Sequence, residues 1–92
     1  MSHTVHIPTP LRQYTDKLDT VQVGGATIGD LLTQLTTTYP ELKKHLYNEQ
    51  GKLRHFVNIY VNDEDIRYLG RLDARVEPGD TVSILPAVAG GA

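Results

Sequence analysis

The sequence predicts an α+β domain in which one main helix covers one face of a mixed sheet of four to five strands. Two observations lead to this prediction. Several short segments alternate apolar and polar residues, as half-buried strands do, and one segment repeats its apolar residues at helical spacing. The order of the segments is strand, strand, helix, strand, short strand, strand. A helix with a single apolar stripe has to cover one face of the sheet.

Two short strands come first. In residues 4–8, "TVHIP", Val5 and Ile7 share one face, and Pro8 ends the strand. In residues 19–25, "DTVQVGG", two valines repeat the alternation and a glycine pair follows. Because the two segments are close in sequence, we expect them to pair as a hairpin with a long loop.

A single main helix is predicted to begin after Thr27. Thr27 is a good N-cap residue, and Asp30 stands three residues later, in a variant of the capping box. Pro40 ends the helix, a short second helix is expected in residues 40–48, and residues 48–52 form an exposed loop. The apolar stripe of the main helix consists of Ile28, Leu31, Leu32, Leu35 and Tyr39.

The strongest predicted strand is "FVNIYVND", and turns separate it from the strands that follow. Residues 62–65 have turn chemistry, and a short strand is expected over residues 66–69, "IRYL". Pro78 and Gly79 form a second turn. The last strand, residues 81–85, alternates again. The inward residues of these strands are predicted to be Val57, Ile59, Val61, Val82 and Ile84.

This order of elements is that of the β-grasp, or ubiquitin-like, fold. In it the first and last strands lie side by side and parallel at the centre of the sheet. The C-terminus leaves from the end of that central strand. We therefore divide the chain into a β-grasp domain, residues 1–86, and a flexible C-terminal tail, residues 87–92, that carries the glycine pair.

Composition argues against several classes of function. The chain has 92 residues and a formal charge of −2 without a basic block, so no nucleic-acid partner is expected. It contains no apolar segment long enough to span a membrane and no secretory signal, which predicts a cytoplasmic protein without a membrane partner. There is no cysteine, and the histidines have no recognised ligand spacing, so we expect no metal site and no catalytic residues. Surface positions are expected for His3, His6, His45 and His55.

The glycine pair of the tail indicates a chemical role for the C-terminal carboxylate. Gly90 and Gly91 lack side chains, so they can thread a narrow channel of a partner enzyme in extended form. A terminal carboxylate delivered there can be adenylated. A sulfur donor can then displace the nucleotide and leave a thiocarboxylate. A carrier of this kind needs no catalytic residue of its own.

Four segments resemble the ThiS/MoaD family of sulfur-carrier proteins, and "FVNIYVNDEDIR" and "ILPAVAGG" look closest to its CysO-type members. The four segments are, in order, "IPTPLR", "TIGDLL", "FVNIYVNDEDIR" and "EPGDTVSILPAVAGG". The resemblance implies that the chain is not an enzyme and binds no cofactor. It implies instead a substrate for an adenylating enzyme that uses ATP, with the thiocarboxylate on Gly91.

Further partners follow from the same resemblance. It implies a sulfur-accepting enzyme, which in the CysO-type case is a pyridoxal-phosphate-dependent cysteine synthase, and a metalloprotease that cuts after the diglycine. Ala92 departs from the family, whose active form ends in Gly-Gly. Because the carbonyl of Gly91 is locked in an amide, we expect a peptidase to remove Ala92 first. The alternative is that Ala92 is a residue left by cloning.

Other functions stay open at this point. The chain could be a ubiquitin-like modifier conjugated to lysines through Gly91, the small subunit of a molybdopterin-synthase-like enzyme, or a plain interaction domain. For a sulfur carrier, cysteine, thiamin, a thiolated tRNA base or a secondary metabolite could receive the sulfur.

Partner binding is expected on the open face of the sheet and along the tail. Strand alternation turns large apolar side chains outward there, and exposed apolar patches mark interfaces. The residues expected to bind partners are Phe56, Tyr60, Leu85, Pro86 and Val88. A basic cluster before the last strand could pair with an acidic rim on the activating enzyme, or could be an ordinary solvated face. It consists of Arg67, Arg71 and Arg75.

Overall fold

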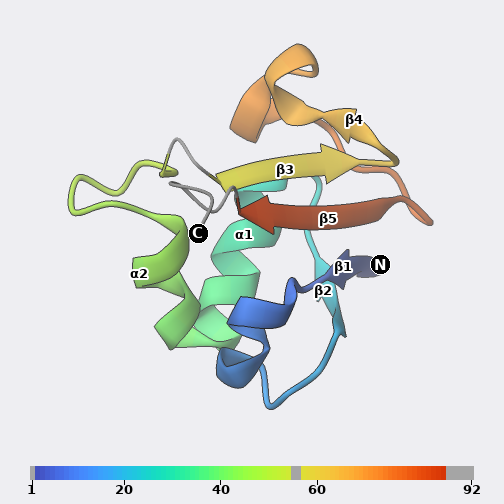
Figure 1. The fold of residues 1–92 in the computed structure, drawn as a ribbon. Coiled ribbons are helices and arrows are strands. Elements are labelled where there is room, and N and C mark those ends of the chain that lie inside the picture. Colours follow the sequence, from blue (N-terminus) through green and yellow to red (C-terminus); the bar gives the residue numbers. More distant parts are fainter. Residues whose placement is uncertain (1, 55–56, 87–92) are drawn as a thin grey trace.

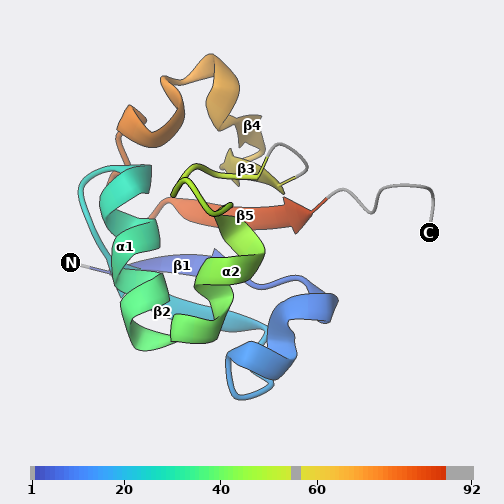
Figure 2. The ribbon, with the colours of Figure 1, turned by 90° about the vertical axis from the view of Figure 1, so that its left-hand side faces the viewer.

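The computed structural model describes residues 2–54 and 57–86, and in them helices cover one face of a five-stranded mixed sheet (Figures 1 and 2). The strands are β1 (Ser2–His6), β2 (Thr20–Gly24), β3 (Val57–Val61), β4 (Glu64–Asp65) and β5 (Thr81–Pro86). The α-helices are α1 (Ile28–Thr38) and α2 (Lys43–Leu46). Turns of 3₁₀ helix cover Thr9–Tyr14, Pro40–Leu42, Ile66–Tyr68 and Arg71–Asp73.

The sheet has the predicted β-grasp topology. Its strand order is β2-β1-β5-β3-β4, so β5, the last strand in sequence, lies in the middle. β5 runs parallel to β1 and antiparallel to β3, while β1 and β2 form an antiparallel hairpin. β4 pairs with β3 only at Tyr60 and Val61. The expectation of parallel first and last strands at the centre is confirmed.

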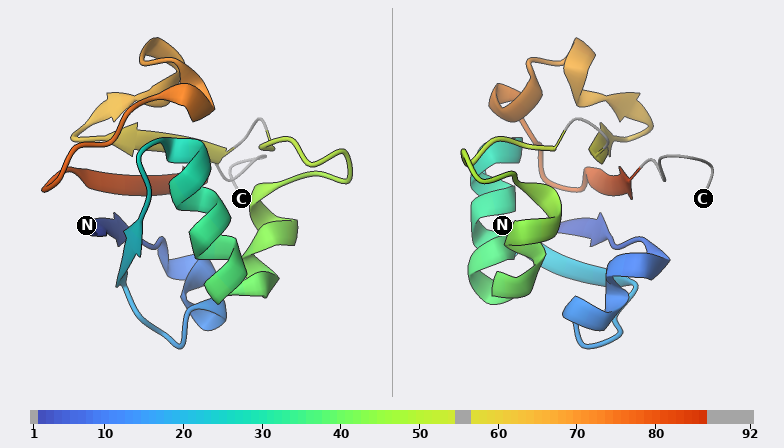
Figure 3. Two further views of the ribbon diagram at one scale, coloured as in Figure 1. Left: turned by 180° about the vertical axis from the view of Figure 1, so that it is seen from behind. Right: turned by 60° about the vertical axis from the view of Figure 1, so that its left-hand side comes forward.

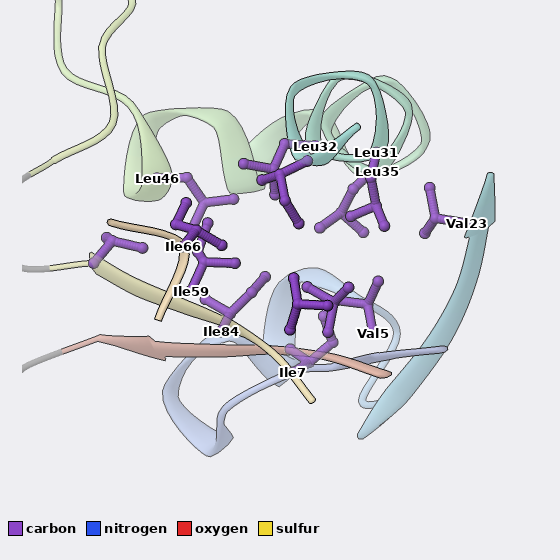
Figure 4. Close-up of a cluster of buried hydrophobic side chains, with 14 of the residues drawn as sticks. Val5, Ile7, Val23, Leu31, Leu32, Leu35, Leu46, Ile59, Ile66 and Ile84 are labelled. Carbon is purple, nitrogen blue, oxygen red and sulfur yellow. The ribbon is translucent and has the colours of Figure 1, made fainter. Parts of the chain in front are cut away.

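One apolar core fills the space between the helices and the sheet (Figure 4). The inward residues of the strands are those that the alternation predicts, and α1 buries its stripe against them. Tyr39 is partly buried against this core. The side chains that are almost completely buried include Val5, Ile7, Ile28, Leu31, Leu32, Leu35, Leu42, Leu46, Ile59, Val82 and Ile84.

Helix α1 begins as its sequence predicts. The backbone N–H of Asp30 donates to Oγ1 of Thr27 at 3.2 Å, which satisfies one of the free donors of the first turn. Thr27 itself is extended, with φ −130° and ψ 166°. The helix crosses the sheet, and α2 packs beside it on the same face (Figure 3, left).

The expectation of a short strand over residues 66–69 is wrong. The strand is two residues earlier, at β4, and residues 66–68 form a 3₁₀ turn. The cause is local: the side chain of Asp65 accepts a hydrogen bond from the backbone N–H of Arg67 at 2.9 Å, which favours a turn over a continued strand. Asn62 and Asp63, both at positive φ, make the tight hairpin turn before it.

The expectation of a surface position is wrong for His3. Its side chain is only 3 % exposed, on the same side of β1 as Val5, and its Nε2 lies 2.8 Å from the carbonyl oxygen of Gly25. Strand alternation places His3 inward, because it stands two residues before Val5. The imidazole therefore ties β1 to the chain just before α1.

The other histidines differ from one another. His6 is exposed, as expected. His45 is half-buried and stacks on Tyr14, with 4.4 Å between the ring centroids. His55 lies outside the described residues. Within the described part of the chain, no three side chains of the metal-ligating types come together, and no helix is long and apolar enough to cross a membrane.

The connection between β1 and β2 is more ordered than the long loop that we expected. It forms the 3₁₀ turn Thr9–Tyr14 and buries Leu11. Thr15 is fully buried, and its hydroxyl donates to the carbonyl of Leu18 at 3.0 Å. The side chain of Arg12 donates to the carbonyl of Ile7 at 3.0 Å, which fixes this segment to the end of β1.

Gly25 is required by close packing, and this gives a testable prediction. At φ +140° its backbone passes so near α1 that a Cβ would lie 2.7 Å from the backbone nitrogen of Leu31. Gly51 also has positive φ, at +78°, but a Cβ there would meet nothing within 4 Å. We expect Gly51→Ala to cost about 1 kcal/mol of unfolding free energy and Gly25→Ala about 3 kcal/mol or more. Urea unfolding measures both, and equal losses would contradict the packing argument.

Asp80 gives a second prediction. Its carboxylate accepts hydrogen bonds from the backbone N–H of Glu77 and from Nδ2 of Asn62, each at 2.8 Å, and these bonds hold the pKa of Asp80 below its ordinary value. A lowered pKa in the folded chain means that the ionised group stabilises the fold above the pKa of an unfolded Asp, near about 4. This stabilisation is lost as the pH falls through the lower folded pKa.

We therefore expect Asp80→Ala to have a lower unfolding free energy than the wild type at neutral pH. The difference between the two should shrink toward zero at acid pH. Chemical unfolding across the pH range measures it. A difference that stays constant down to acid pH would show that the carboxylate contributes no pH-dependent stability.

Candidate functional site

The candidate site is the end of the sheet at which the tail is attached. β5 ends at Pro86, the last described residue (Figure 2). In the sequence, residues 87–92 follow it. Val88, Gly90, Gly91 and Ala92, on which the sequence-based site predictions fall, lie outside the described residues. The structure therefore describes the end of β5 and the strands that pair with it, which we call the platform.

In the platform, β5 is paired with a strand on each side and packs against the core on one face. β1 pairs with the first half of β5, up to Ser83, and β3 pairs with β5 from Val82 to Pro86. The side chains of Val82 and Ile84 are buried in the core beneath the helices. These contacts fix the position of the end of β5, where the tail is attached.

The face opposite the helices carries the exposed apolar residue that we predicted. Leu85 is 49 % exposed and pairs across the sheet with Asn58. Tyr60 pairs with Ser83 on the same face and is half-buried. Tyr60 and Leu85 are thus diagonal neighbours, within reach of a single partner residue.

Two other predicted contact residues are described only in part or not at all. Phe56 lies outside the described residues. Pro86 pairs with Val57 through the backbone. A binding role for the predicted set, Phe56, Tyr60, Leu85, Pro86 and Val88, stays a prediction.

The three arginines do not form one cluster. Arg67 is paired with Asp65, with 2.7 Å between Nη2 and Oδ2, and it also donates to Oδ1 of Asn58 at 3.2 Å. The side-chain and backbone hydrogen bonds that Asp65 accepts from Arg67 lower the pKa of Asp65, whose side chain is 7 % exposed. Arg71 lies near Arg67, whereas Arg75 lines a different surface hollow, beside His3.

Sequence reasoning missed a surface hollow of about 480 Å³ next to the start of β3. We call it the basic hollow, because four cationic residues line it. They are Lys52, Arg54, Arg67 and Arg71. The first two come from the loop before β3 and the others from the turns after β4. Spacing in sequence gave no sign that these two segments meet, since only the sheet brings them together.

Comparisons with known proteins agree with this fold. The sequence profile described as the ThiS family matches residues 5–91. The chain is 46 % identical over 93 residues to the sulfur carrier protein CysO of Mycobacterium tuberculosis, and the match covers 99 % of this chain and 100 % of the relative.

Solved structures give the same result. A chain of the BexX/CysO complex of Amycolatopsis orientalis superposes with a TM-score of 0.87 at 46 % identity, covering 96 % of this chain and 98 % of that one. The small archaeal modifier protein 1 of Methanosarcina acetivorans gives a TM-score of 0.88 at 28 % identity, covering 98 % and 96 %. The extent of these matches leads to one conclusion: this chain belongs to the ThiS family.

Proposed function

We propose that this chain is a sulfur carrier protein whose reactive group is the carboxylate of Gly91. The observation that carries the proposal is that the ThiS-family match extends through residue 91, well past the end of β5 at Pro86. The similarity to the CysO sulfur carrier supports the same function. The chain acts as a protein substrate and sulfur donor for partner enzymes rather than as an enzyme.

The chemistry takes place in partner enzymes. In an adenylating enzyme, a carboxylate oxygen of Gly91 attacks the α-phosphorus of ATP and pyrophosphate leaves. A sulfide-equivalent nucleophile then attacks the carbonyl carbon and AMP leaves, which gives the thiocarboxylate. ATP is used by the partner, and this chain supplies the carboxylate and a stiff support for it.

The platform suits this task. From Pro86 to Gly91 the chain can reach at most about 17 Å when fully extended, because each residue spans at most about 3.4 Å. A partner therefore has to bind the folded domain close to its own active site. This requirement fits a recognition surface around Leu85 at the end of the sheet.

The finer steps follow from the CysO-type resemblance. We propose that the sulfur acceptor is an enzyme of cysteine biosynthesis, of the pyridoxal-phosphate-dependent synthase type, or of another sulfur-containing metabolite. A metalloprotease that cuts after the diglycine would remove Ala92 before activation. The acceptor enzyme, rather than this chain, determines the final product.

A second candidate function is that of a protein modifier. The likeness to a small archaeal modifier protein favours it. Both functions need the same adenylated glycine, and they differ in the nucleophile that attacks it: sulfide in the carrier and a lysine amine in the modifier. A ladder of covalent conjugates on a denaturing gel would favour the modifier.

The first prediction of this function concerns Ala92. We expect the full-length chain to keep its mass when it is incubated with ATP, the adenylating enzyme and sulfide. A chain that ends at Gly91 should gain the mass of one oxygen-to-sulfur exchange, and the same chain without ATP is the control. Intact-mass spectrometry reads all three. If the full-length chain gains sulfur without first losing alanine, the processing step is wrong.

The second prediction concerns Leu85. Leu85→Asp should keep the fold and reduce the kcat/KM of adenylation by about thirtyfold, because the substitution removes a central apolar contact and places a carboxylate in the interface. Leu18→Asp is the matched control, because Leu18 is 46 % exposed against 49 % for Leu85 and lies in the β1–β2 connection. Pyrophosphate release measures the rate. Equal rates in the two variants would remove Leu85 from the recognition surface.

A further inference from the structure

The basic hollow carries an excess of positive charge. Among the described residues that line it, Asp65 is the sole carboxylate, and its partner is Arg67 at 2.7 Å. Arg54 donates from Nε to the carbonyl of Lys44 at 3.1 Å, which fixes its guanidinium at the rim. Lys52 and Arg71 are exposed, and neither is paired with an acid in the described part of the chain.

The hollow also has an apolar floor and a sheet edge. Leu53 and Leu72 line it and pack, partly buried, against the core. β4 covers β3 only at Tyr60 and Val61, so the edge of β3 at residues 57–59 borders the hollow instead of another strand. Apolar surface, a partly free edge and fixed cations together fit an extended peptide segment.

A tight turn holds Arg71 at the rim of the hollow. Arg71 has positive φ, at 58°, and begins the 3₁₀ turn that closes through a hydrogen bond from the N–H of Ala74 to its carbonyl at 3.0 Å. A side chain with a Cβ disfavours this conformation. The turn places Arg71 among the residues that line the hollow.

Charge is unevenly distributed along the sheet. Acidic residues gather at the other end, in the turn after β3, at the start of β4 and in the segment before β5; they are Asp63, Glu64, Glu77 and Asp80. The basic hollow lies instead beside Val57, which pairs with Pro86. The end from which the tail leaves is therefore positive, although the whole chain has a formal charge of −2.

We propose that the basic hollow docks an extended acidic segment of the adenylating enzyme, with one apolar side chain on the Leu53–Leu72 floor and carboxylates at Lys52 and Arg71. This inference rests on the proposed function for the identity of the partner. A segment bound there lies next to the start of the tail. The same partner then holds the domain by two surfaces, the hollow at the sheet edge and the open face around Leu85.

The test compares two charge reversals in the full chain. Arg71→Glu changes a cation of the hollow. Lys17→Glu is the matched control, because Lys17 is also exposed, also has positive φ, at 66° against 58°, and lies in the β1–β2 connection. Binding to the adenylating enzyme is measured by biolayer interferometry without ATP. We expect Arg71→Glu to weaken binding about tenfold and Lys17→Glu less than about twofold, with the difference shrinking as salt rises.

A second variant distinguishes a loss of binding from a loss of folding stability. Arg71→Gly removes the charge and relieves the strained backbone, so it should weaken binding while thermal unfolding shows no loss of stability. Full binding by both Arg71 variants, or equal weakening by Lys17→Glu, would overturn the proposal. So would self-association in sedimentation experiments that Arg71→Glu abolishes, because the hollow would then bind the acidic end of a second copy.

Different results would contradict the docking site and the proposed function. Thiocarboxylate formation on the chain that ends at Gly91 tests the function alone. If Arg71→Glu forms the thiocarboxylate as fast as the unsubstituted chain and binds the adenylating enzyme equally well, the docking proposal is wrong and the sulfur-carrier function stands. If no thiocarboxylate forms while Arg71→Glu still weakens binding selectively, the hollow docks this enzyme and the carrier function is wrong.

Discussion

The central position of β5 is the constraint on which the rest of the structure depends. β5 is paired on one side with β1, in parallel, and on the other with β3, and its inward side chains are buried under α1. The last strand of the domain is thus supported by a neighbouring strand on each side. A tail attached to an edge strand or a loop would not share this support.

In the proposed carrier, the folded domain and the tail with its glycine pair have separate tasks. In the function that we propose, the domain supplies recognition through exposed side chains in the sheet and at its edge, such as Leu85 and Arg71. The tail supplies a carboxylate that can enter a narrow active site. Because the chemistry belongs to the partners, a chain this small can serve a reaction sequence without a catalytic centre of its own.

The sequence was sufficient where the signal is local and periodic. The alternation in β3 and β5 and the Thr27 cap predicted the main elements and their inward faces. It failed where a side chain competes with the backbone: Asp65 turns the chain at Arg67, so a 3₁₀ turn replaces the strand expected over residues 66–69. It also failed for His3: without a recognised ligand spacing we expected it at the surface, whereas strand alternation places it inward. The basic hollow joins segments that only the fold brings together, so no local pattern could reveal it.

The most direct test of the central claim is the chemical state of the C-terminus in the cells that make this chain. The chain is purified, its sulfur is trapped by alkylation, and its C-terminal peptide is fragmented in a mass spectrometer. We expect a population that ends at Gly91 and carries a thiocarboxylate there. A chain that is found only with Ala92 attached, or with Gly91 joined to lysine side chains of other proteins, would contradict the account.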